Sequence, residues 1–353
     1  MGLIENQPVK PGDITGDMEH SPLTLDAGMM QNVRKQKTLV RPVNCAGIAL
    51  HSGATVSITL APGEKDEGIL FRRTDVSRDK CEIRARWDKV VATTMCTTLG
   101  NDQGVTIRTV EHLMAALYGC GVDNAVIEVD GPEMPIMDGS AQPFVFLIEC
   151  AGTVEQDAPL RAIEVLKPVR IKDGGAVAEL RPAERPSFTF EIDFDSRAVA
   201  RQDISVTMIN GTFKKEIARA RTFGFAEDVE KLRAAGLARG GSLDNAVVVS
   251  GDEILNEDGL RYEDEFVRHK VLDAVGDLYL AGAPILGEFQ AVCSGHGINN
   301  QLVRALFADP DAWRLTLMGE ANPEMKAQPP QSVQPAPVIE KGTQGTSTVA
   351  AAL

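Results

Sequence analysis

The chain has 353 residues, 43% of them hydrophobic, and its 36 Lys and Arg against 50 Asp and Glu give a net charge of −14. This length and composition can bury the core of one large domain or of two ordinary domains. The acidic balance argues against general binding to nucleic acid or to an anionic membrane, because both need a basic field, but it is compatible with a local basic pocket for a phosphate.

The six cysteines show no CxxC pair and no disulfide-like spacing, which is typical of a reducing compartment. No apolar stretch of about 18 residues predicts a transmembrane helix, and residues 1–10 contain no apolar signal region. We therefore expect a cytoplasmic protein with no membrane span and no nucleic-acid partner.

The two ends of the chain differ in composition from its body. Residues 1–35 are polar and lack periodicity, and residues 320–353 are rich in Pro, Gln, Ala, Thr and Gly. Both compositions predict disordered segments, and we expect neither to have a catalytic role.

The body shows the order strands, helix, strand twice. The first half has strands at 55–60 and 69–72, a helix at 110–118 and a strand at 124–129. The second half has strands at 176–180 and 188–194, a helix through 268–277 and a strand at 285–292. This repetition predicts a duplicated α+β unit with domains at residues 36–157 and 158–319.

The first helix has signals at both ends. Thr109 is expected to cap its N-terminus, and Glu111 suits its first turn. Gly119 and Gly121 are expected to end it. The second half also contains an insertion-like segment at 226–249, with a short helix at 227–235 and an apolar run at 246–249. This segment could form the wall of an apolar ligand site or an ordinary part of the core.

The second helix carries the chemistry from which the rest of the interpretation starts. His269 and Asp273 lie one turn apart on one face, Asp277 continues the stripe, and Gly276 leaves room for close approach. Imidazole and carboxylate groups are good ligands for zinc or iron. The alternative is a surface helix whose polar side chains meet water.

Glu111 and His112 are adjacent at the start of the first helix, about 100° apart around its axis. One could bind a metal while the other reaches a water on that metal. With His112, His269 and Asp273 as ligands and Glu111 as the base, the set matches a hydrolytic zinc site. The alternative for His112 is a helix histidine with a water partner.

Two further positions could support such chemistry. His296 lies between glycines before a helix expected near residue 298; it could give a proton to a leaving amine, with Asp277 keeping it protonated. Thr222 could donate its hydroxyl to a developing oxyanion. The alternatives are a loop histidine in solvent and a turn with ordinary aromatic packing.

Seven motifs, in order between about residue 36 and residue 308, resemble the UDP-3-O-acyl-N-acetylglucosamine deacetylase family of lipid A synthesis. They are Thr-Val-Glu-His-Leu at 109–113, Asp-Asn at 123–124, Pro-Glu-Met-Pro-Ile-Met-Asp-Gly-Ser at 132–140, Ala-Arg-Thr-Phe-Gly-Phe at 220–225, Leu-Asn-Glu-Asp-Gly-Leu-Arg at 255–261, Phe-Val-Arg-His-Lys-Val-Leu-Asp at 266–273 and Ser-Gly-His at 294–296. Each motif alone is weak, whereas seven in the family's order are specific.

The resemblance implies an α+β fold of two similar β-α-α-β sandwich domains packed through their helices, with the active site between them. The resemblance implies that His112, His269 and Asp273 are the metal ligands and that Glu111 is the base. It further implies that His296 is the acid, with Asp277 as its carboxylate partner, and that Thr222 supplies the oxyanion-stabilising hydroxyl. It also implies substrate contacts: Phe223, Ala238, Ser242 and Ala246 along an acyl-chain passage in the insertion at about 222–250, Met95 and His51 near the acyl group and sugar, and Lys270 and Lys167 near the UDP part. Arg239 is charged where an apolar residue is expected, so the acyl-chain length stays open.

The implied reaction is zinc-dependent hydrolysis of the N-acetyl group of UDP-3-O-acyl-N-acetylglucosamine, which releases acetate and UDP-3-O-acyl-glucosamine. Fe²⁺ could occupy the same ligands in the cell. One alternative is a non-haem Fe(II) oxygenase with the same two histidines and one carboxylate, although an oxygenase has no need of a carboxylate base beside a ligand. The other is a non-catalytic carrier of acylated sugars, which would lack the ligands.

Overall fold

The computed structural model describes residues 33–209 and 211–319, and the segments predicted to be disordered at 1–32 and 320–353 lie outside this range. Lys35, the last residue of the predicted N-terminal extension, already begins β1 (Lys35–Leu39). Within the described ranges, no helix is long and apolar enough to cross a membrane.

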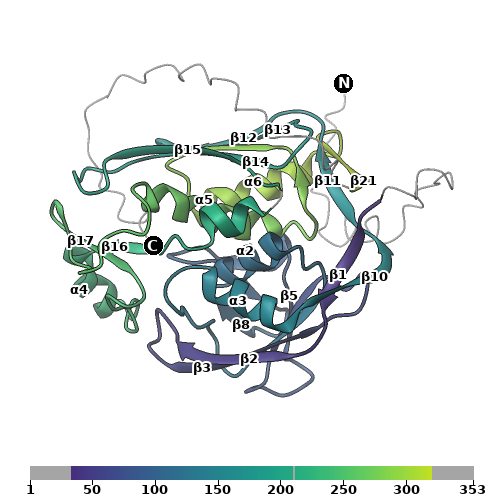
Figure 1. Cartoon of the computed structure of the whole chain (residues 1–353), viewed down its shortest axis with the longest axis horizontal. Coiled ribbons are helices and arrows are strands. Elements are labelled where there is room, and N and C mark those ends of the chain that lie inside the picture. The colour runs from purple at the N-terminus through teal and green to yellow at the C-terminus, as the bar shows by residue number, and fades with distance from the viewer. Residues whose placement is uncertain (1–32, 210, 320–353) are drawn as a thin grey trace, which may run out of the picture.

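Two five-stranded mixed sheets with the same topology form the outer layers of the molecule (Figure 1). The strand orders are β2-β3-β9-β4-β5 and β12-β13-β20-β14-β15, and in each sheet only the third and fourth strands are parallel. This shared topology confirms the predicted duplication of an α+β unit. The strands are β2 (Val43–Ile48), β3 (Thr55–Pro62), β4 (Ile69–Arg73), β5 (Glu82–Arg84), β9 (Ala125–Val129), β12 (Val169–Asp173), β13 (Ala176–Arg181), β14 (Ser187–Asp193), β15 (Arg201–Thr207) and β20 (Glu288–Val292).

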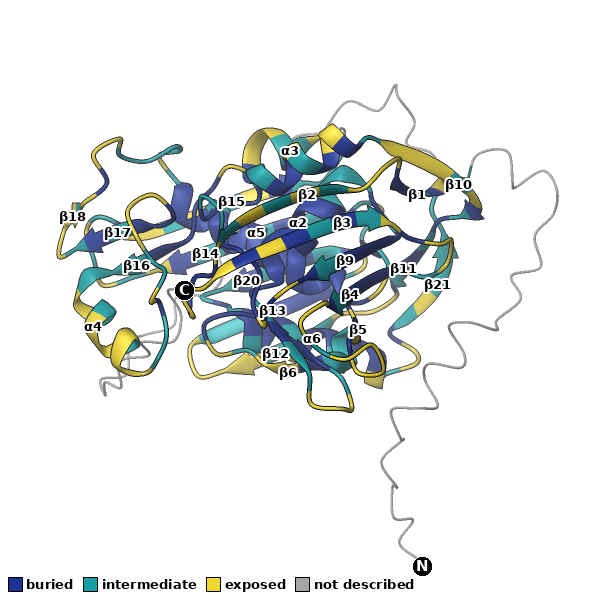
Figure 2. Ribbon diagram, turned by 90° about the horizontal axis from the view of Figure 1, so that it is seen from below, coloured by how far each residue is buried: buried dark blue, intermediate teal, exposed yellow. Residues whose placement is uncertain are grey.

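Four helices lie between the two sheets and form the inner layers (Figure 1), and the central pair, α2 and α5, is mostly dark blue, the colour of buried residues, in Figure 2. They are α2 (Glu111–Cys120), α3 (Gln142–Ala151), α5 (Glu265–Tyr279) and α6 (His296–Ala308). The helices α2 and α5 pack directly against each other at the centre of the core, and each comes from a different half of the chain. The expected packing of two layers through their helices is therefore confirmed, and α3 is a helix that the sequence did not predict.

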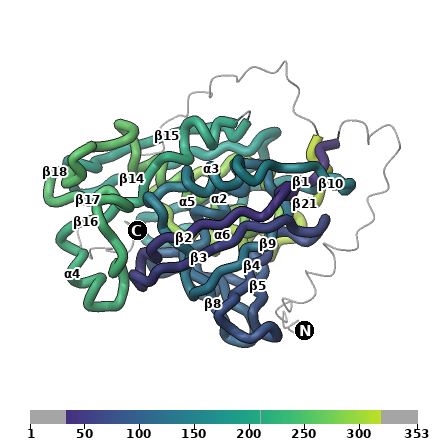
Figure 3. Tube along the Cα trace, turned by 60° about the horizontal axis from the view of Figure 1, so that its bottom comes forward, coloured from purple at the N-terminus to yellow at the C-terminus, as the bar shows by residue number. Residues whose placement is uncertain are grey.

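Each half carries an insertion at the same point of its topology, between β5 and α2 in the first half and between β15 and α5 in the second. The second insertion was predicted; the first, a small sheet, was not. Figure 3 shows the second insertion at one end of the molecule and β1 and β10 at the other. The insertions contain β6 (Val90–Ala92), β7 (Thr98–Gly100) and β8 (Thr106–Arg108) in the first half, and β16 (Phe223–Phe225), α4 (Ala226–Ala234), β17 (Val247–Ser250) and β18 (Glu253–Ile254) in the second.

The strand expected at 285–292 is interrupted at Gly287, which corrects the prediction. Its first part, β19 (Ile285–Leu286), pairs with β11 (Arg161–Val165), whereas its second part, β20, enters the central sheet. A β-carbon on Gly287 would lie 2.8 Å from Val165 and 3.0 Å from the carbonyl oxygen of Arg181, so the crossing needs glycine. The remaining elements are β10 (Thr153–Pro159), β21 (Trp313–Leu317), the short 3₁₀-helix η2 (Trp87–Lys89) and the short π-helix η3 (Phe213–Ile217).

The two ends of α2 differ from the predicted signals. Thr109 does not cap the helix: its φ is 59°, and its hydroxyl donates to Glu133 at 3.5 Å instead. Gly119 lies within the helix, where a β-carbon would overlap the ring of Phe213, so it permits close packing rather than ending the helix. Gly121, with φ 66°, is the C-cap as expected.

The predicted domain boundary between residues 157 and 158 falls inside β10, which pairs with β1 of the first half. The next strand, β11, begins at Arg161 and pairs with β19 and β21. The exact boundary between the two units therefore stays a prediction.

Candidate metal centre

The helix α5 is buried along nearly its whole length, on its polar face as well as on its apolar face. His269, Asp273 and Asp277 are each 2–4% exposed. The alternative of a surface helix with solvated polar side chains is therefore wrong. Burial of these polar groups requires partners inside the protein, because each loses its contacts with water.

The partner face belongs to α2, and Gly276 sets how closely the two helices approach. A β-carbon at Gly276 would lie 2.1 Å from the carbonyl oxygen of Glu111, too close for any side chain. The absence of a side chain there lets the first turn of α2 rest on α5. This contact brings Glu111 and His112 to the polar stripe of α5, which confirms the close approach predicted from the sequence.

Three donor groups converge where the two helices meet. Nε2 of His112 lies 3.5 Å from Oδ1 of Asp273, and Nε2 of His269 lies 3.4 Å from the same oxygen. One ligand atom from each residue lies within 4.8 Å of the other two, and all three residues are buried. Oδ1 of Asp273 has no hydrogen-bond partner among the described residues. A buried, unpaired carboxylate oxygen flanked by two imidazoles fits a divalent cation well.

The environment keeps these groups in the forms that bind metals. Nδ1 of His269 lies 3.1 Å from the carbonyl oxygen of Ala220; as a donor to that oxygen, it leaves the lone pair of Nε2 toward Asp273. Burial lowers the pKa of His269 to about 4, so the ring is neutral at pH 7. Burial alone would raise the pKa of Asp273, but the neighbouring His269 and His112 hold it below its ordinary value.

Glu111 lies beside the three donors without joining them. Its Oε2 accepts a hydrogen bond from the main-chain N–H of Thr97 at 3.1 Å. Its Oε1 lies 3.8 Å from Nε2 of His296. Burial raises the pKa of Glu111 to about 7, against the opposing effect of the nearby histidines. A carboxylate with a pKa near neutrality is suited to accept a proton as a general base.

His296 begins α6 rather than preceding it, and it is 6% exposed, so the alternative of a solvated loop histidine is wrong. Its Nδ1 lies 2.8 Å from Oδ2 of Asp277, as the sequence suggested. Asp277 also accepts from the hydroxyl of Thr97 at 2.6 Å and from the amide of Asn299 at 2.9 Å. Burial would lower the pKa of His296, but Asp277 and Glu111 outweigh it and raise the pKa to about 10.

Thr222 is buried at the edge of the second insertion, two residues after Ala220. Its N–H donates to the carbonyl of Gly139 at 2.8 Å, and its carbonyl accepts from the N–H of Val247 at 2.8 Å. These bonds join Thr222 to a loop of the first half and to β17. The main chain at Thr222 is therefore fixed from both halves.

Two of the predicted substrate residues, Phe223 and Lys270, lie beside the donor cluster. The ring of Phe223 lies 6.4 Å from that of His269 and packs against Phe266. Nζ of Lys270 lies 5.6 Å from the centre of the Phe223 ring and 3.9 Å from Oδ2 of Asp273. Both side chains are buried, so they form part of the wall beside the cluster.

The structure also brings His51 and Ala238 together from opposite halves. The N–H of Ala238 lies 3.4 Å from Nδ1 of His51, while Nε2 of His51 is buried without a hydrogen-bond partner among the described residues. Burial lowers the pKa of His51 to about 4. Met95, which has a φ of 64°, lies two residues before Thr97, whose main-chain N–H donates to Glu111.

The other predicted substrate residues are more widely spread. Ser242 and Ala246 lie in the loop before β17, where Asn256 holds the carbonyl of Ala246 at 2.8 Å. Lys167 is not brought into this group: its exposed ammonium pairs with Asp309, just past the C-terminal end of α6. The 13 residues of α6 separate that end from His296 by about 20 Å.

Sequence interpretation missed two residues of the site, Thr97 and Asn299. Thr97 is a polar residue directly before β7, and nothing local distinguishes it, because its partner Asp277 is 180 residues away. Asn299 had a usable signal. Once α6 begins at His296, Asn299 lies three residues on and shares its face of the helix.

Comparison with known proteins agrees with this geometry. The family model of UDP-3-O-acyl N-acetylglycosamine deacetylase matches residues 36–308. A UDP-3-O-acyl-N-acetylglucosamine deacetylase of Phenylobacterium zucineum is 54% identical over 285 residues, which cover 81% of this chain and 97% of the relative. Proteins of the same name from Shewanella oneidensis and Shewanella frigidimarina are each 54% identical over 282 residues, covering 79% of this chain and 92% of each relative.

Proposed function

The chain belongs to the UDP-3-O-acyl-N-acetylglucosamine deacetylase family, and we propose that it carries out this deacetylation where α2 and α5 meet. The substrate is a UDP-linked, 3-O-acylated N-acetylglucosamine, and the products are acetate and the free amino sugar, as a step of lipid A synthesis. The observation that carries the assignment of the site is the convergence of His112, His269 and Asp273 beside Glu111.

The three donors would hold one divalent cation, which we propose to be zinc. Two imidazoles and one carboxylate leave a fourth coordination position open, which is typical of hydrolytic zinc sites, and iron(II) binds the same donor set. When bound, the cation would supply Lewis-acid chemistry, which polarises a carbonyl group and makes water a better nucleophile at neutral pH.

Glu111 acts as the general base. Its pKa of about 7 lets it accept a proton from water near neutral pH as the water oxygen adds to the acetamide carbonyl carbon. The hydrogen bond from the N–H of Thr97 fixes the direction of this carboxylate, so that one oxygen is held and the other faces His296. The base is therefore oriented before the substrate arrives.

His296 is the proposed acid. With a pKa raised to about 10 it is cationic at neutral pH, and Asp277 holds its Nδ1 so that Nε2–H points to the Glu111 side. Together with the hydroxyl of Thr222, it stabilises the oxyanion that forms on the former carbonyl oxygen. Breaking of the C–N bond then requires a proton on the leaving nitrogen, after which acetate and the amino sugar separate.

The substrate contacts implied by the family resemblance are part of the same proposal. Ala238 and Ala246 are small, buried residues of the second insertion, which supports a passage for the acyl chain beside Phe223. His51, next to Ala238, and Met95 would face the acyl group and the sugar. The other contacts proposed for the substrate are Ser242 for the acyl chain, and Lys270 and Lys167 for the UDP part.

The two alternatives receive no support. The relatives compared above carry the deacetylase name, which favours neither an oxygenase nor a carrier protein. We also propose that the reaction takes place in the cytoplasm: all six cysteines are free thiols, which agrees with a reducing compartment.

The test combines metal analysis with an acetate-release assay on UDP-3-O-acyl-N-acetylglucosamine. We expect about one zinc or iron per chain, loss of acetate release after chelation, and its return on adding Zn²⁺. A His269→Ala variant should lose both the metal and the activity. Acetate release by metal-free protein at the wild-type rate would refute the proposal.

A further inference from the structure

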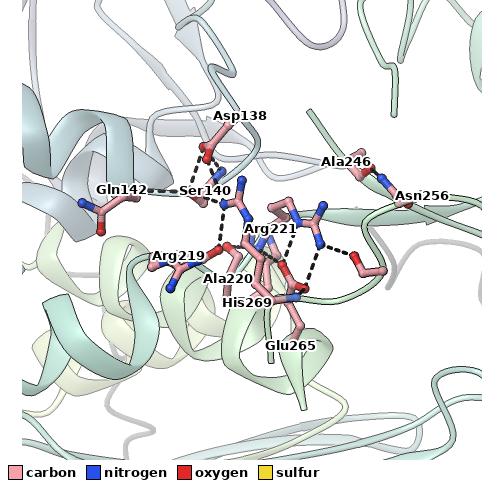
Figure 4. Close-up of polar contacts among 12 residues, drawn as sticks. Asp138, Ser140, Gln142, Arg219, Ala220, Arg221, Ala246, Asn256, Glu265 and His269 are labelled. Carbon is pink, nitrogen blue, oxygen red and sulfur yellow. Dashed lines mark hydrogen bonds and ion pairs between the residues drawn. The ribbon is translucent and has the colours of Figure 1, made fainter. Parts of the chain in front are cut away.

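Residues 219–221 lie against the first turns of α5 and are held there by a buried ion pair (Figure 4). The carbonyl of Ala220 meets Nδ1 of His269 at 3.1 Å, and the next residue, Arg221, pairs with Glu265. Glu265 lies four residues before His269, on the same face of α5. The segment therefore contacts α5 at two successive turns of one face, and one of these contacts is a proposed metal ligand.

The ion pair fixes direction as well as distance. Nε and Nη2 of Arg221 donate to the two carboxylate oxygens of Glu265 at 2.9 and 3.1 Å. The main-chain N–H groups of Arg221 and Arg261 donate to the same two oxygens at 2.9 and 2.6 Å. Each oxygen of this fully buried carboxylate thus accepts two hydrogen bonds. A planar guanidinium in a two-pronged contact tolerates little rotation.

A second contact holds the other side of Ala220. Nη1 of Arg261 donates to the carbonyl of Arg219 at 3.0 Å and to Oδ2 of Asp138 at 2.8 Å. Asp138 belongs to the first half of the chain and accepts from the hydroxyl of Ser140 at 2.8 Å. The carbonyl that meets His269 is therefore held from both neighbouring residues, and the chain of contacts runs from the first half to the donor cluster.

Stability alone is a weak reason for such an arrangement. A buried ion pair contributes little net stability compared with apolar residues of similar volume, because both charges lose their hydration. A hydrogen-bond acceptor behind a ligating histidine has a clear effect, however: it sets the tautomer and the ring orientation, and its loss typically lowers metal affinity 10- to 100-fold. The geometry around Ala220 matches this second role.

We propose that Arg221 and Glu265 are positioning residues of the metal centre. They fix the carbonyl of Ala220, which keeps the Nε2 lone pair of His269 directed at the site shared with Asp273. The inference rests on the proposed function, because it takes His269 to be a ligand. It adds a determinant of metal affinity that touches neither the metal nor the substrate.

The test is the Zn²⁺ affinity of the full-length, metal-free protein, measured by competition with a chromophoric chelator. Glu265→Gln keeps the side-chain shape, but its amide nitrogen cannot accept from Arg221 or Arg261. We expect its Zn²⁺ affinity to fall about 10- to 100-fold. Asp264→Asn is the matched control: it removes the neighbouring ion pair with Arg268 at the same helix end and should leave the affinity unchanged.

A purely structural role predicts a different result. In that case Glu265→Gln would lower the melting temperature of the metal-free protein, while the folded fraction would bind Zn²⁺ and show the Co²⁺ absorption spectrum as the wild type does. We expect a changed Co²⁺ spectrum instead. Should Glu265→Gln not fold, Arg221→Lys keeps the charge but loses the two-pronged contact, and its affinity should fall in the same direction.

The outcomes separate this inference from the proposed function. Wild-type affinity and an unaltered Co²⁺ spectrum in Glu265→Gln, or in Arg221→Lys where it is the variant measured, would overturn the positioning role and leave the metal site standing. If instead the wild type and His269→Ala bound Zn²⁺ equally, His269 would not be a ligand, and both conclusions would fall.

Discussion

The contact between Gly276 and the carbonyl of Glu111 gives the sharpest test of how the site is assembled. A Gly276→Ala variant places a methyl group 2.1 Å from that oxygen and 2.8 Å from the carbonyl carbon, and both atoms belong to the main chain. No rotamer can relieve this overlap. Raising the shorter distance from 2.1 Å to the 3.4 Å of ordinary contact requires α2 and α5 to separate by about 1.3 Å.

The separation acts directly on the donor cluster, because its members lie on both helices. His112 moves with α2, while His269 and Asp273 stay on α5, so one ligand is displaced by about 1 Å from the other two. A misplacement of this size typically costs about 100-fold in rate, and overpacking costs roughly 1–3 kcal/mol. Alanine is the better helix former by about 1 kcal/mol, which leaves a net stability loss of up to about 2 kcal/mol.

The assay is kcat/KM for acetate release, together with the melting temperature and the zinc content. We expect kcat/KM to fall about 100-fold. Gly175→Ala is the control, because a β-carbon at this position in the turn between β12 and β13 has no atom within 4 Å, and its φ lies outside the left-handed region. Wild-type activity and zinc content in Gly276→Ala would refute the idea that this contact sets the geometry of the site.

Three further predictions concern the chemistry. Glu111→Gln should bind zinc normally but lose about 10²- to 10⁴-fold in kcat, measured by acetate release; full turnover would exclude Glu111 as the base. Asp277→Asn removes the main group that keeps His296 protonated, so the pKa of His296 falls, and the decline of kcat/KM at alkaline pH should begin at a lower pH than in the wild type. If kcat/KM of the variant declined at the same alkaline pH as that of the wild type, His296 would be excluded as the titrating acid. Ala246→Leu should lower kcat/KM for the longest acyl chains while sparing shorter ones, tested with substrates of graded chain length; an equal effect on all lengths would argue against an acyl passage there.

The elements that sequence could predict are those with a strong local pattern. The stripe of His269, Asp273 and Asp277 on α5 was visible because residues four apart share a helix face. The duplicated order of strands and helices was visible because one strand of each sheet, β3 in the first and β14 in the second, alternates apolar and polar residues. These patterns identified the fold class and the residues of the candidate centre.

The features that sequence missed depend on contacts between distant residues. Thr109 resembles a helix cap, but its hydroxyl bonds to Glu133, 24 residues along the chain. The strands β6, β7 and β8 have three residues each, too few for a periodic signal. The acceptor behind His269 is the main-chain carbonyl of Ala220. Every residue has such a carbonyl, so the type of residue at this position does not reveal the contact.

The two halves share a strand order, but they are not chemically equivalent. One helix contributes Glu111 and His112 from its first turn, and the other contributes His269 and Asp273 from its middle. A cation bound by all three ligands would therefore bridge the two repeats, and its binding energy would add to the cohesion between them. Neither repeat expressed alone could assemble the complete ligand set, so tight metal binding in a mixture of separated halves would signal that they had reassociated.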